Sequence, residues 1–333
     1  MGKLKFAILS FAHIHAWSYA SVLKDLEKEN EVEFVAVYDD DPERLKKAAE
    51  AYGVKQYSDY IRLLEVEKPD AVIVTSENAK HISQVLAACE KGIHVLCEKP
   101  IATTLKDADE MIRAVEKSGV KFQTAFVMRY HEVTVETKRI IDEGSIGEIV
   151  AITSTNHGKY PGLWFGDPDL AGGGAIMDHT VHNADLMRWY TKDEAKEVYA
   201  IYKKNIRDYL KVEDNALITI RFKKGVVASI DCSWSRPDSW PIWGDVYLGI
   251  FGTEGYIVVD AFRSFIILAP DKGAMTSRYF GTNPDYEMIK DFIRVIKEDD
   301  TPRATVYDGR QALEIALAAY KSLEKKAPVE LPL

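Results

Sequence analysis

The stretch KFAILSFAHIHAWSYASVL, residues 5–23, consists of a short apolar run, a turn and a helical pattern. A buried strand that leads through a tight turn into a helix is the usual start of a doubly wound α/β domain. In such domains this turn often carries G-x-G-x-x-G, whose glycines allow a phosphate to approach the backbone. Here the turn reads Ser10-Phe11-Ala12-His13-Ile14-His15 and contains none of the three glycines. The turn alone therefore leaves open whether a nucleotide binds.

The first 125 residues repeat this strand–helix pattern. Between the apolar runs lie helical segments such as DPERLKKAAEAYG, which begins at an Asp-Pro signal and ends at Gly53. The apolar runs are short and rich in β-branched residues, as expected of parallel strands buried on both faces, and they fall at 5–9, 33–38, 71–75, 93–97 and 121–126. The pattern predicts a Rossmann-type domain over residues 1–125.

After residue 126 the order of elements changes. Helical patterns at 131–149 and 172–190 are followed by consecutive strand-like runs, which predicts antiparallel pairing because no helix separates them. The runs fall at 195–203, 213–223, 226–235, 245–251 and 255–260, and closing helices are expected at 284–298 and 308–325. We therefore expect residues 126–333 to form an α+β domain with a large, mostly antiparallel open sheet.

Composition excludes several classes of function. The 333 residues carry a net charge of −9, which argues against general affinity for nucleic acid or for anionic membranes. No run of about 18 apolar residues is present, so no membrane span is expected. The three cysteines, Cys89, Cys97 and Cys232, have no CxxC spacing and fit reduced thiols of a cytoplasmic protein. Small-molecule chemistry is the expected function.

Two features favour a nucleotide site despite the missing glycines. Ser10 and Ala12 are small, and the N-terminus of the following helix supplies backbone N–H groups to a pyrophosphate. The second strand ends VAVYDDD, which places Asp39 near the expected position of a carboxylate that binds the adenosine ribose. Alternatively, Asp39 merely starts the turn before Pro42. Asp40 and Asp41 stand where NADP would need a basic partner for its 2′-phosphate, and none is apparent, so NAD is preferred over NADP.

Two longer segments carry a resemblance. They are GIHVLCEKPIATTLKDADEMI, residues 92–112, and GGGAIMDHTVHNADLMRW, residues 172–189. With Lys80-His81, FVMRYH, DEGSIGEI and DGRQALEIALAAYKS in this order, the chain strongly resembles the glucose-fructose oxidoreductase/inositol dehydrogenase (Gfo/Idh/MocA) family. The resemblance implies an NAD(P)-binding N-terminal domain, a C-terminal domain whose open sheet makes homodimer or homotetramer contacts, a site in the cleft between them, and a cis Lys99–Pro100 bond.

The resemblance also implies catalytic residues. Lys99 matches the family's E-K-P lysine, and Asp178 and His182 match its GG-x-x-x-D-x-x-x-H pattern. Independently, Asp178, His182 and Asp185 fall at i, i+4 and i+7, on one stripe of a helix. Oxidation of a secondary alcohol needs a proton acceptor, for which histidine is suited at neutral pH, and a cation beside the developing alkoxide, for which lysine is suited. We therefore expect an NAD-dependent oxidoreductase acting on a sugar, cyclitol or related polyol. Two alternatives are a redox-neutral enzyme that retains and recycles NAD, and a ligand-sensing regulator.

Further residues are expected to line the site. His13 and His15 should lie near the pyrophosphate or the nicotinamide; alternatively, one of them caps the first helix. No metal is expected, although the Asp178/His182 spacing with His179 and the His13/His15 pair leaves a metal site as an alternative. The candidates for cofactor binding are Ser10, Ala12, His13, Ile14, Asp39, Asp40, Thr75, Ser76, His81, Glu98 and Lys99. The candidates for substrate binding are Arg129, His157, Tyr160, Trp164 and His179, with Asn156 and Trp243 as further pocket-wall residues.

Overall fold

The computed structural model describes residues 2–263, 265–268, 276–279 and 281–333. The chain divides into two compact units, the first comprising Met1–Val127 and Pro284–Arg310 and the second Met128–Asn283 and Gln311–Leu333. The first unit thus includes helix α9 (Pro284–Glu298), whereas the sequence pattern predicts this helix as part of the second domain. The helix packs on α1 (His15–Lys28), and Phe292 meets Phe6 edge-to-face with ring centroids 6.3 Å apart.

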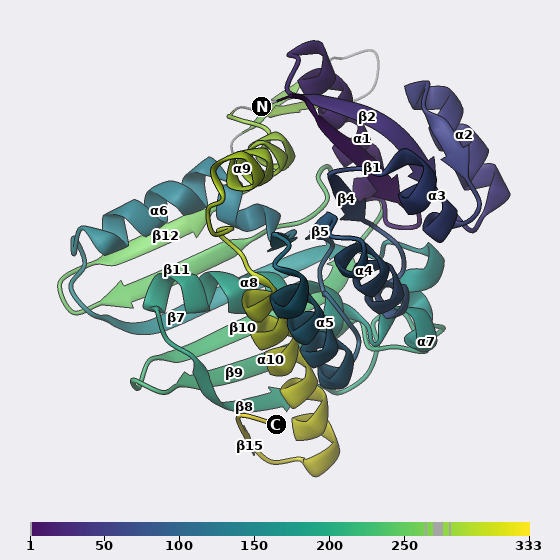
Figure 1. Cartoon of the computed structure of the whole chain (residues 1–333). Coiled ribbons are helices and arrows are strands. Elements are labelled where there is room, and N and C mark those ends of the chain that lie inside the picture. Colours follow the sequence, from purple (N-terminus) through teal and green to yellow (C-terminus); the bar gives the residue numbers. More distant parts are fainter. Residues whose placement is uncertain (1, 264, 269–275, 280) are drawn as a thin grey trace. The chain divides into compact units, whose positions relative to one another are not determined.

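The first unit is built on a parallel six-stranded sheet (Figure 1). Its strand order, β3-β2-β1-β4-β5-β6, is that of the Rossmann fold, so the predicted fold class is confirmed. The strands are β1 (Leu4–Leu9), β2 (Val32–Tyr38), β3 (Lys55–Tyr57), β4 (Ala71–Val74), β5 (His94–Cys97) and β6 (Phe122–Thr124). The helices besides α1 and α9 are α2 (Pro42–Tyr52), α3 (Tyr60–Glu67), α4 (His81–Glu90) and α5 (Leu105–Ser118), with a 3-10 turn η1 (Asn78–Lys80).

Local sequence signals set the limits of these elements. Residues Phe6 to Leu9 of β1 are fully buried, as expected for a strand covered on both faces. The Asp41 carboxylate caps α2 by accepting hydrogen bonds from the backbone N–H groups of Glu43 and Arg44, both at 2.9 Å. Helix α2 ends at Gly53, whose φ of +63° favours glycine.

The second unit is built on a seven-stranded sheet of order β12-β11-β7-β10-β9-β8-β15. Only the β7–β10 pair is parallel among the described pairs of this sheet, so the expected mostly antiparallel sheet is confirmed. Its strands are β7 (Ile149–Lys159), β8 (Ala195–Ile201), β9 (Asn215–Phe222), β10 (Val227–Arg236), β11 (Tyr247–Gly252), β12 (Tyr256–Asp260) and β15 (Val329–Glu330); β13 (Phe265–Leu268) pairs with β14 (Thr276–Tyr279). The helical elements are η2 (Val127–Tyr130), α6 (Glu132–Asp142), η3 (Leu163–Gly166), α7 (Pro168–Ala171), α8 (Ala175–Thr191) and the greater part of α10 (Val306–Lys325), from Gln311 onward.

Helix α8 packs against β7, β9 and β10. Residues that face this helix are buried, and the alternate residues of the same strands are exposed, which leaves the other sheet face open. Among the described residues, no helix is long and apolar enough to cross a membrane.

Candidate active site

The turn after β1 is held by side chains in place of glycines. Ser10 has a φ of +80°, in the region that glycine favours, and so takes the conformation of the first missing glycine. Its hydroxyl accepts a hydrogen bond from Ala12 N–H at 3.1 Å, and its carbonyl accepts one from the Thr75 hydroxyl at 2.7 Å. The His13 N–H donates to the Thr75 carbonyl at 3.0 Å. These backbone N–H groups therefore bond within the protein.

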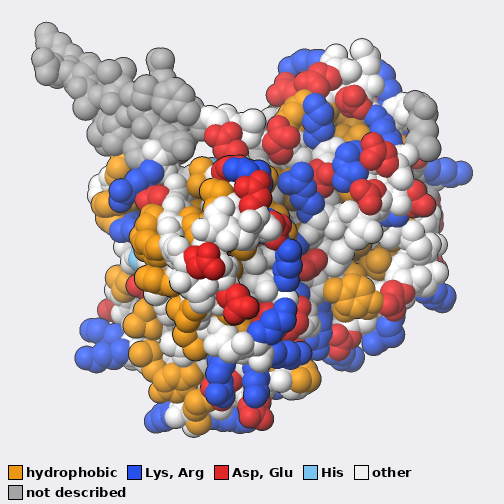
Figure 2. Space-filling model, turned by 90° about the vertical axis from the view of Figure 1, so that its left-hand side faces the viewer, with side chains coloured by type: hydrophobic (Ala, Val, Ile, Leu, Met, Phe, Trp, Pro, Cys, Tyr) orange, Lys and Arg blue, Asp and Glu red, His pale blue; other side chains and the backbone are white. Residues whose placement is uncertain are grey.

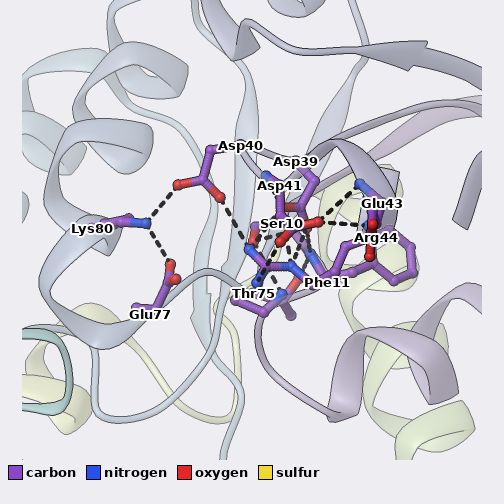
Figure 3. A network of polar contacts seen from close by, with 11 residues as sticks. Ser10, Phe11, Asp39, Asp40, Asp41, Glu43, Arg44, Thr75, Glu77 and Lys80 are labelled. Carbon is purple, nitrogen blue, oxygen red and sulfur yellow. Dashed lines mark hydrogen bonds and ion pairs between the residues drawn. The ribbon is translucent and has the colours of Figure 1, made fainter. Parts of the chain in front are cut away.

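Asp39 is the centre of this network (Figure 3). Its side chain is 0% exposed and accepts hydrogen bonds from Phe11 N–H at 2.6 Å, from Asp41 N–H at 2.8 Å and from Arg44 Nη2 at 2.8 Å. Asp39 thus ties the turn after β1 to the start of α2. The neighbouring carboxylates of Asp40 and Asp41 are each 43% exposed, and that of Asp41 caps α2.

The expectation that no basic residue stands beside Asp39–Asp41 is wrong. Arg44 lies 3.0 Å from Asp40, and Lys80 Nζ lies 2.6 Å from Asp40 and 3.0 Å from Glu77 (Figure 3). Burial alone would raise the pKa of Asp40, but the contacts with Lys80 and Arg44 outweigh it and lower that pKa. Arg44 lies in α2 and Lys80 follows β4, so only the fold reveals that they are neighbours.

Glu98, after β5, is a fully buried carboxylate surrounded by donors. It accepts hydrogen bonds from His15 Nδ1 at 2.9 Å, from Lys99 N–H at 3.0 Å and from the Tyr19 hydroxyl, and His13 Nε2 lies 4.0 Å away. Burial alone would raise the pKa of Glu98, but its contacts with His13 and His15 hold that pKa well below its usual range. Burial would lower the pKa of His15, and the Glu98 carboxylate raises it instead. His15 and Glu98 therefore form an ion pair beside the turn after β1.

His13, His15 and Glu98 place three possible metal ligands within 4.8 Å of one another, the one such group among the described residues. The histidine tautomer argues against a metal there. His13 Nδ1 accepts a hydrogen bond from His15 N–H at 3.2 Å, so the neutral ring carries its proton on Nε2, the atom that would have to ligate. The same contact gives His13 a capping role at the first residue of α1, one of the two alternatives for these histidines.

Lys99 lies directly after β5, is 4% exposed and precedes a cis bond to Pro100, as the resemblance implied. His81 joins this segment to the one after β4, because its ring lies 3.1 Å from the carbonyl oxygens of both Pro100 and Ser76. Ile14, which is 39% exposed, precedes α1. Every candidate cofactor residue therefore follows the carboxyl end of β1, β2, β4 or β5, where this fold binds dinucleotides.

In the second unit, helix α8 carries Asp178 and His182. The N-terminus of α8 is capped from elsewhere in the chain: the Glu213 carboxylate accepts hydrogen bonds from Gly174 N–H at 3.1 Å and Ile176 N–H at 2.8 Å. A Cβ on Gly174 would lie 1.8 Å from the Glu213 carbonyl oxygen, so only glycine fits at this position. Sequence reasoning did not identify Glu213, since nothing local marks it as a cap.

Asp178 is 8% exposed and accepts a hydrogen bond on Oδ2 from Trp234 Nε1 at 3.0 Å. His179 Nε2 lies 3.3 Å from the same oxygen, and His179 Nδ1 lies 2.8 Å from the Asn156 carbonyl oxygen. The structure thus brings the candidates Asp178, His179 and Asn156 together, and adds Trp234, which the sequence did not single out.

Other candidates have different surroundings. Arg129 donates to Asp185 from Nε at 2.7 Å and Nη2 at 2.6 Å, in a buried ion pair that joins η2 to α8. Tyr160 packs on Trp234 with ring centroids 5.3 Å apart, whereas Trp164 stacks on Phe165 at 4.1 Å. The structure therefore brings Tyr160 into contact with Trp234, the residue that donates to Asp178.

His157 does not join Asp178 and His179. It follows Asn156 on β7, and alternation along the strand turns its side chain to the open face of the sheet. There His157 lies 3.2 Å from both Asp231 and Asp245. Burial would lower its pKa, but these two carboxylates raise it to about 9.

Comparisons with known proteins agree with this architecture. Residues 12–126 match a model described as an oxidoreductase family with an NAD-binding Rossmann fold, and residues 134–258 match a GFO/IDH/MocA C-terminal domain. Myo-inositol 2-dehydrogenase of Thermotoga maritima is 31% identical over 310 residues, which cover 89% of this chain and 90% of that protein. The chain belongs to the GFO/IDH/MocA family. Like its family, it is an NAD-dependent oxidoreductase.

Two further relatives fit this placement in the GFO/IDH/MocA family. The 1,5-anhydro-D-fructose reductase of Ensifer adhaerens is 33% identical over 274 residues, or 76% of this chain and 77% of that protein. A crystal structure of a probable dehydrogenase from Thermotoga maritima has a TM-score of 0.84 at 28% identity, and the match covers 98% of this chain and 99% of that one.

The residues after the parallel strands fit NAD. The first unit holds an exposed carboxylate, Asp40, after β2 and the positive end of the α1 helix dipole after β1, although the N–H groups of Ala12, His13 and His15 bond within the protein. These are the groups that a ribose and a pyrophosphate require, although the turn before α1 lacks glycine.

Proposed function

We propose that this enzyme oxidises a secondary hydroxyl group of a cyclitol or sugar, or reduces the corresponding ketone. The names of its relatives, myo-inositol 2-dehydrogenase and 1,5-anhydro-D-fructose reductase, support this substrate class. So does Tyr160, whose partly exposed ring packs on the buried Trp234 and offers a flat apolar face to a sugar ring.

We assign the catalytic roles to Lys99, Asp178 and His182. His182 accepts the hydroxyl proton, because a partly exposed histidine on α8 can exchange protons at neutral pH. Lys99 stabilises the negative charge that develops on the oxygen, and Asp178 orients the proton acceptor. NAD, when bound, supplies the acceptor for the hydride that leaves carbon. The observation that carries this assignment is the capped α8, which holds Asp178 at its start and His182 one turn later.

We propose that NAD is recognised by Asp40 at the ribose and by the segment from Ser10 to Ile14 at the pyrophosphate. Asp39, the residue expected to bind the ribose, is buried and bonded to protein donors. Its role is therefore to hold in place the segment that carries Asp40. The remaining candidates, Thr75, Ser76, His81 and Glu98, hold the segments after β4 and β5 against the turn.

We also propose that a second copy of the chain covers the open face of the second unit's sheet. This face exposes apolar side chains on five strands. Monomeric soluble proteins rarely expose an apolar patch of this extent. They are Tyr199, Ile201, Leu217, Val227, Phe251, Tyr256 and Val258, each at least 36% exposed. Hydrophobic side chains gather in rows at the lower left of Figure 2.

We further propose a cytoplasmic location, which the three buried free cysteines favour.

The test is a screen of cyclitols and sugars with NAD, followed at the absorbance of NADH. We expect reduction of NAD with at least one of these compounds, and a dimer or tetramer by light scattering. Binding of NAD without turnover of any cyclitol or sugar would contradict the proposed substrate class.

A further inference from the structure

His179 lies between two hydrogen-bond acceptors. Its Nδ1 is 2.8 Å from the Asn156 carbonyl oxygen, and its Nε2 is 3.3 Å from Asp178 Oδ2. A neutral imidazole carries one N–H and one lone pair, so one of these oxygens would then face a nitrogen without a proton. An imidazolium satisfies both oxygens.

His81 is an internal comparison. Its two ring nitrogens also lie near oxygens, at 3.1 Å from the carbonyls of Ser76 and Pro100, and burial lowers its pKa. Both of these acceptors are neutral, whereas one acceptor of His179 is a carboxylate. Hydrogen bonds between an ionised donor and an ionised acceptor are roughly twice as strong as those between neutral groups, so the charge of Asp178 favours the second proton on His179.

Trp234 reinforces the pair. Its indole N–H donates to Asp178 Oδ2, the oxygen that also faces His179, and the Trp234 side chain is fully buried. The hydrogen bond from Trp234 and the contact with His179 thus meet on one oxygen of Asp178, a residue that is only 8% exposed.

We propose that His179 is a positioning residue that stays doubly protonated, pairs with Asp178 and holds that carboxylate ionised and oriented for the reaction. The inference rests on the proposed role of Asp178. It gives a function to His179, which stands at an unspecified position of the GG-x-x-x-D-x-x-x-H pattern.

Gly158 makes room for this arrangement. A Cβ on Gly158 would lie 2.8 Å from His179 Cε1 and 3.0 Å from Trp243 Nε1, so Gly158→Ala displaces the imidazole without removing any of its chemistry. The backbone of Gly158 is not in the positive-φ region, so alanine is otherwise compatible with the strand.

The protonation state of His179 can be measured by NMR. The full chain, labelled with ¹⁵N-histidine and saturated with NAD, is examined by NMR at pH 7.5, and His179→Gln assigns the His179 signals by their loss. We expect both ring nitrogens in the protonated range. A signal from one unprotonated nitrogen would overturn the inference.

The positioning role is tested by kinetics on the substrate found in the screen. His179→Gln keeps a neutral N–H near Asp178 but loses the charge, so we expect kcat to fall about 10- to 100-fold with KM within about threefold of wild type. Gly158→Ala should lower kcat in the same way. His131→Asn, which keeps a capping acceptor at the start of α6, is the control and should match wild type. Wild-type kcat in His179→Gln, or a loss confined to KM, would overturn the positioning role. Failure of the proposed function would instead appear as a wild-type enzyme that oxidises no polyol, and the NMR result would still decide the state of His179.

Discussion

The Asp39 carboxylate accepts hydrogen bonds from the backbone N–H of Phe11 at 2.6 Å and from the Arg44 guanidinium at 2.8 Å, and so joins the turn after β1 to helix α2. A turn that lacks glycines is thereby fixed by a buried side chain. Asp39 has a structural role, whereas Asp40 beside it is exposed.

Asp39→Asn should destabilise the protein. The amide leaves Arg44 without its buried counter-charge, and we expect a loss of about 1–3 kcal/mol in the free energy of unfolding, measured by urea denaturation. Asp40→Asn is the matched control and should change that free energy by no more than about 0.5 kcal/mol, because Asp40 is exposed. Equal effects of the two substitutions would contradict the structural role of Asp39.

The wild-type enzyme should bind NAD more tightly than NADP. Arg44 and Lys80 are paired with Asp40, so their charges are neutralised before a 2′-phosphate arrives. Asp40→Asn should raise the affinity for NADP and lower that for NAD, measured by calorimetry. Tighter binding of NADP than of NAD by the wild type would contradict the neutralisation of Arg44 and Lys80 by Asp40.

The His15–Glu98 pair should make stability depend on pH. Because the pKa of His15 is raised above 6.5 in the folded state, its contribution is fully present below pH 6.5 and is lost as pH rises through the folded pKa. Glu98 stays ionised across this range, since its pKa is well below 4.5. The difference in unfolding free energy between wild type and His15→Gln should therefore shrink as pH increases from 6.5. A difference that is constant with pH would show that the pair is not charged.

Gly174→Ala should displace the start of α8. The added Cβ would meet the Glu213 carbonyl oxygen at 1.8 Å, so we expect a loss of more than about 2 kcal/mol in unfolding free energy. Tyr320→Phe removes one hydroxyl contact of the same cap and should cost about 1 kcal/mol. Denaturation curves of both variants test this order, and a Gly174→Ala protein as stable as wild type would refute it.

The sequence allowed the parallel sheet to be predicted because its strands are short apolar runs, as in Phe6–Leu9. It did not reveal β7, since Thr153 to Lys159 are polar residues with no apolar alternation. Without β7, the opposite orientations of Asn156 and His157 could not be inferred, and His157 was placed with the substrate residues. The contacts of Arg44 and Lys80 with Asp40 depend on how two loops meet, which no local pattern encodes.

The most direct test of the catalytic assignment is the turnover of His182→Ala at saturating NAD and polyol. We expect kcat to fall about 10²- to 10⁴-fold with nearly unchanged NAD affinity, because proton transfer contributes to the transition state and not to cofactor binding. His13→Ala should do the reverse, weakening NAD binding more than the chemical step. Wild-type turnover by His182→Ala, with the chemical step rate-limiting, would contradict the assignment.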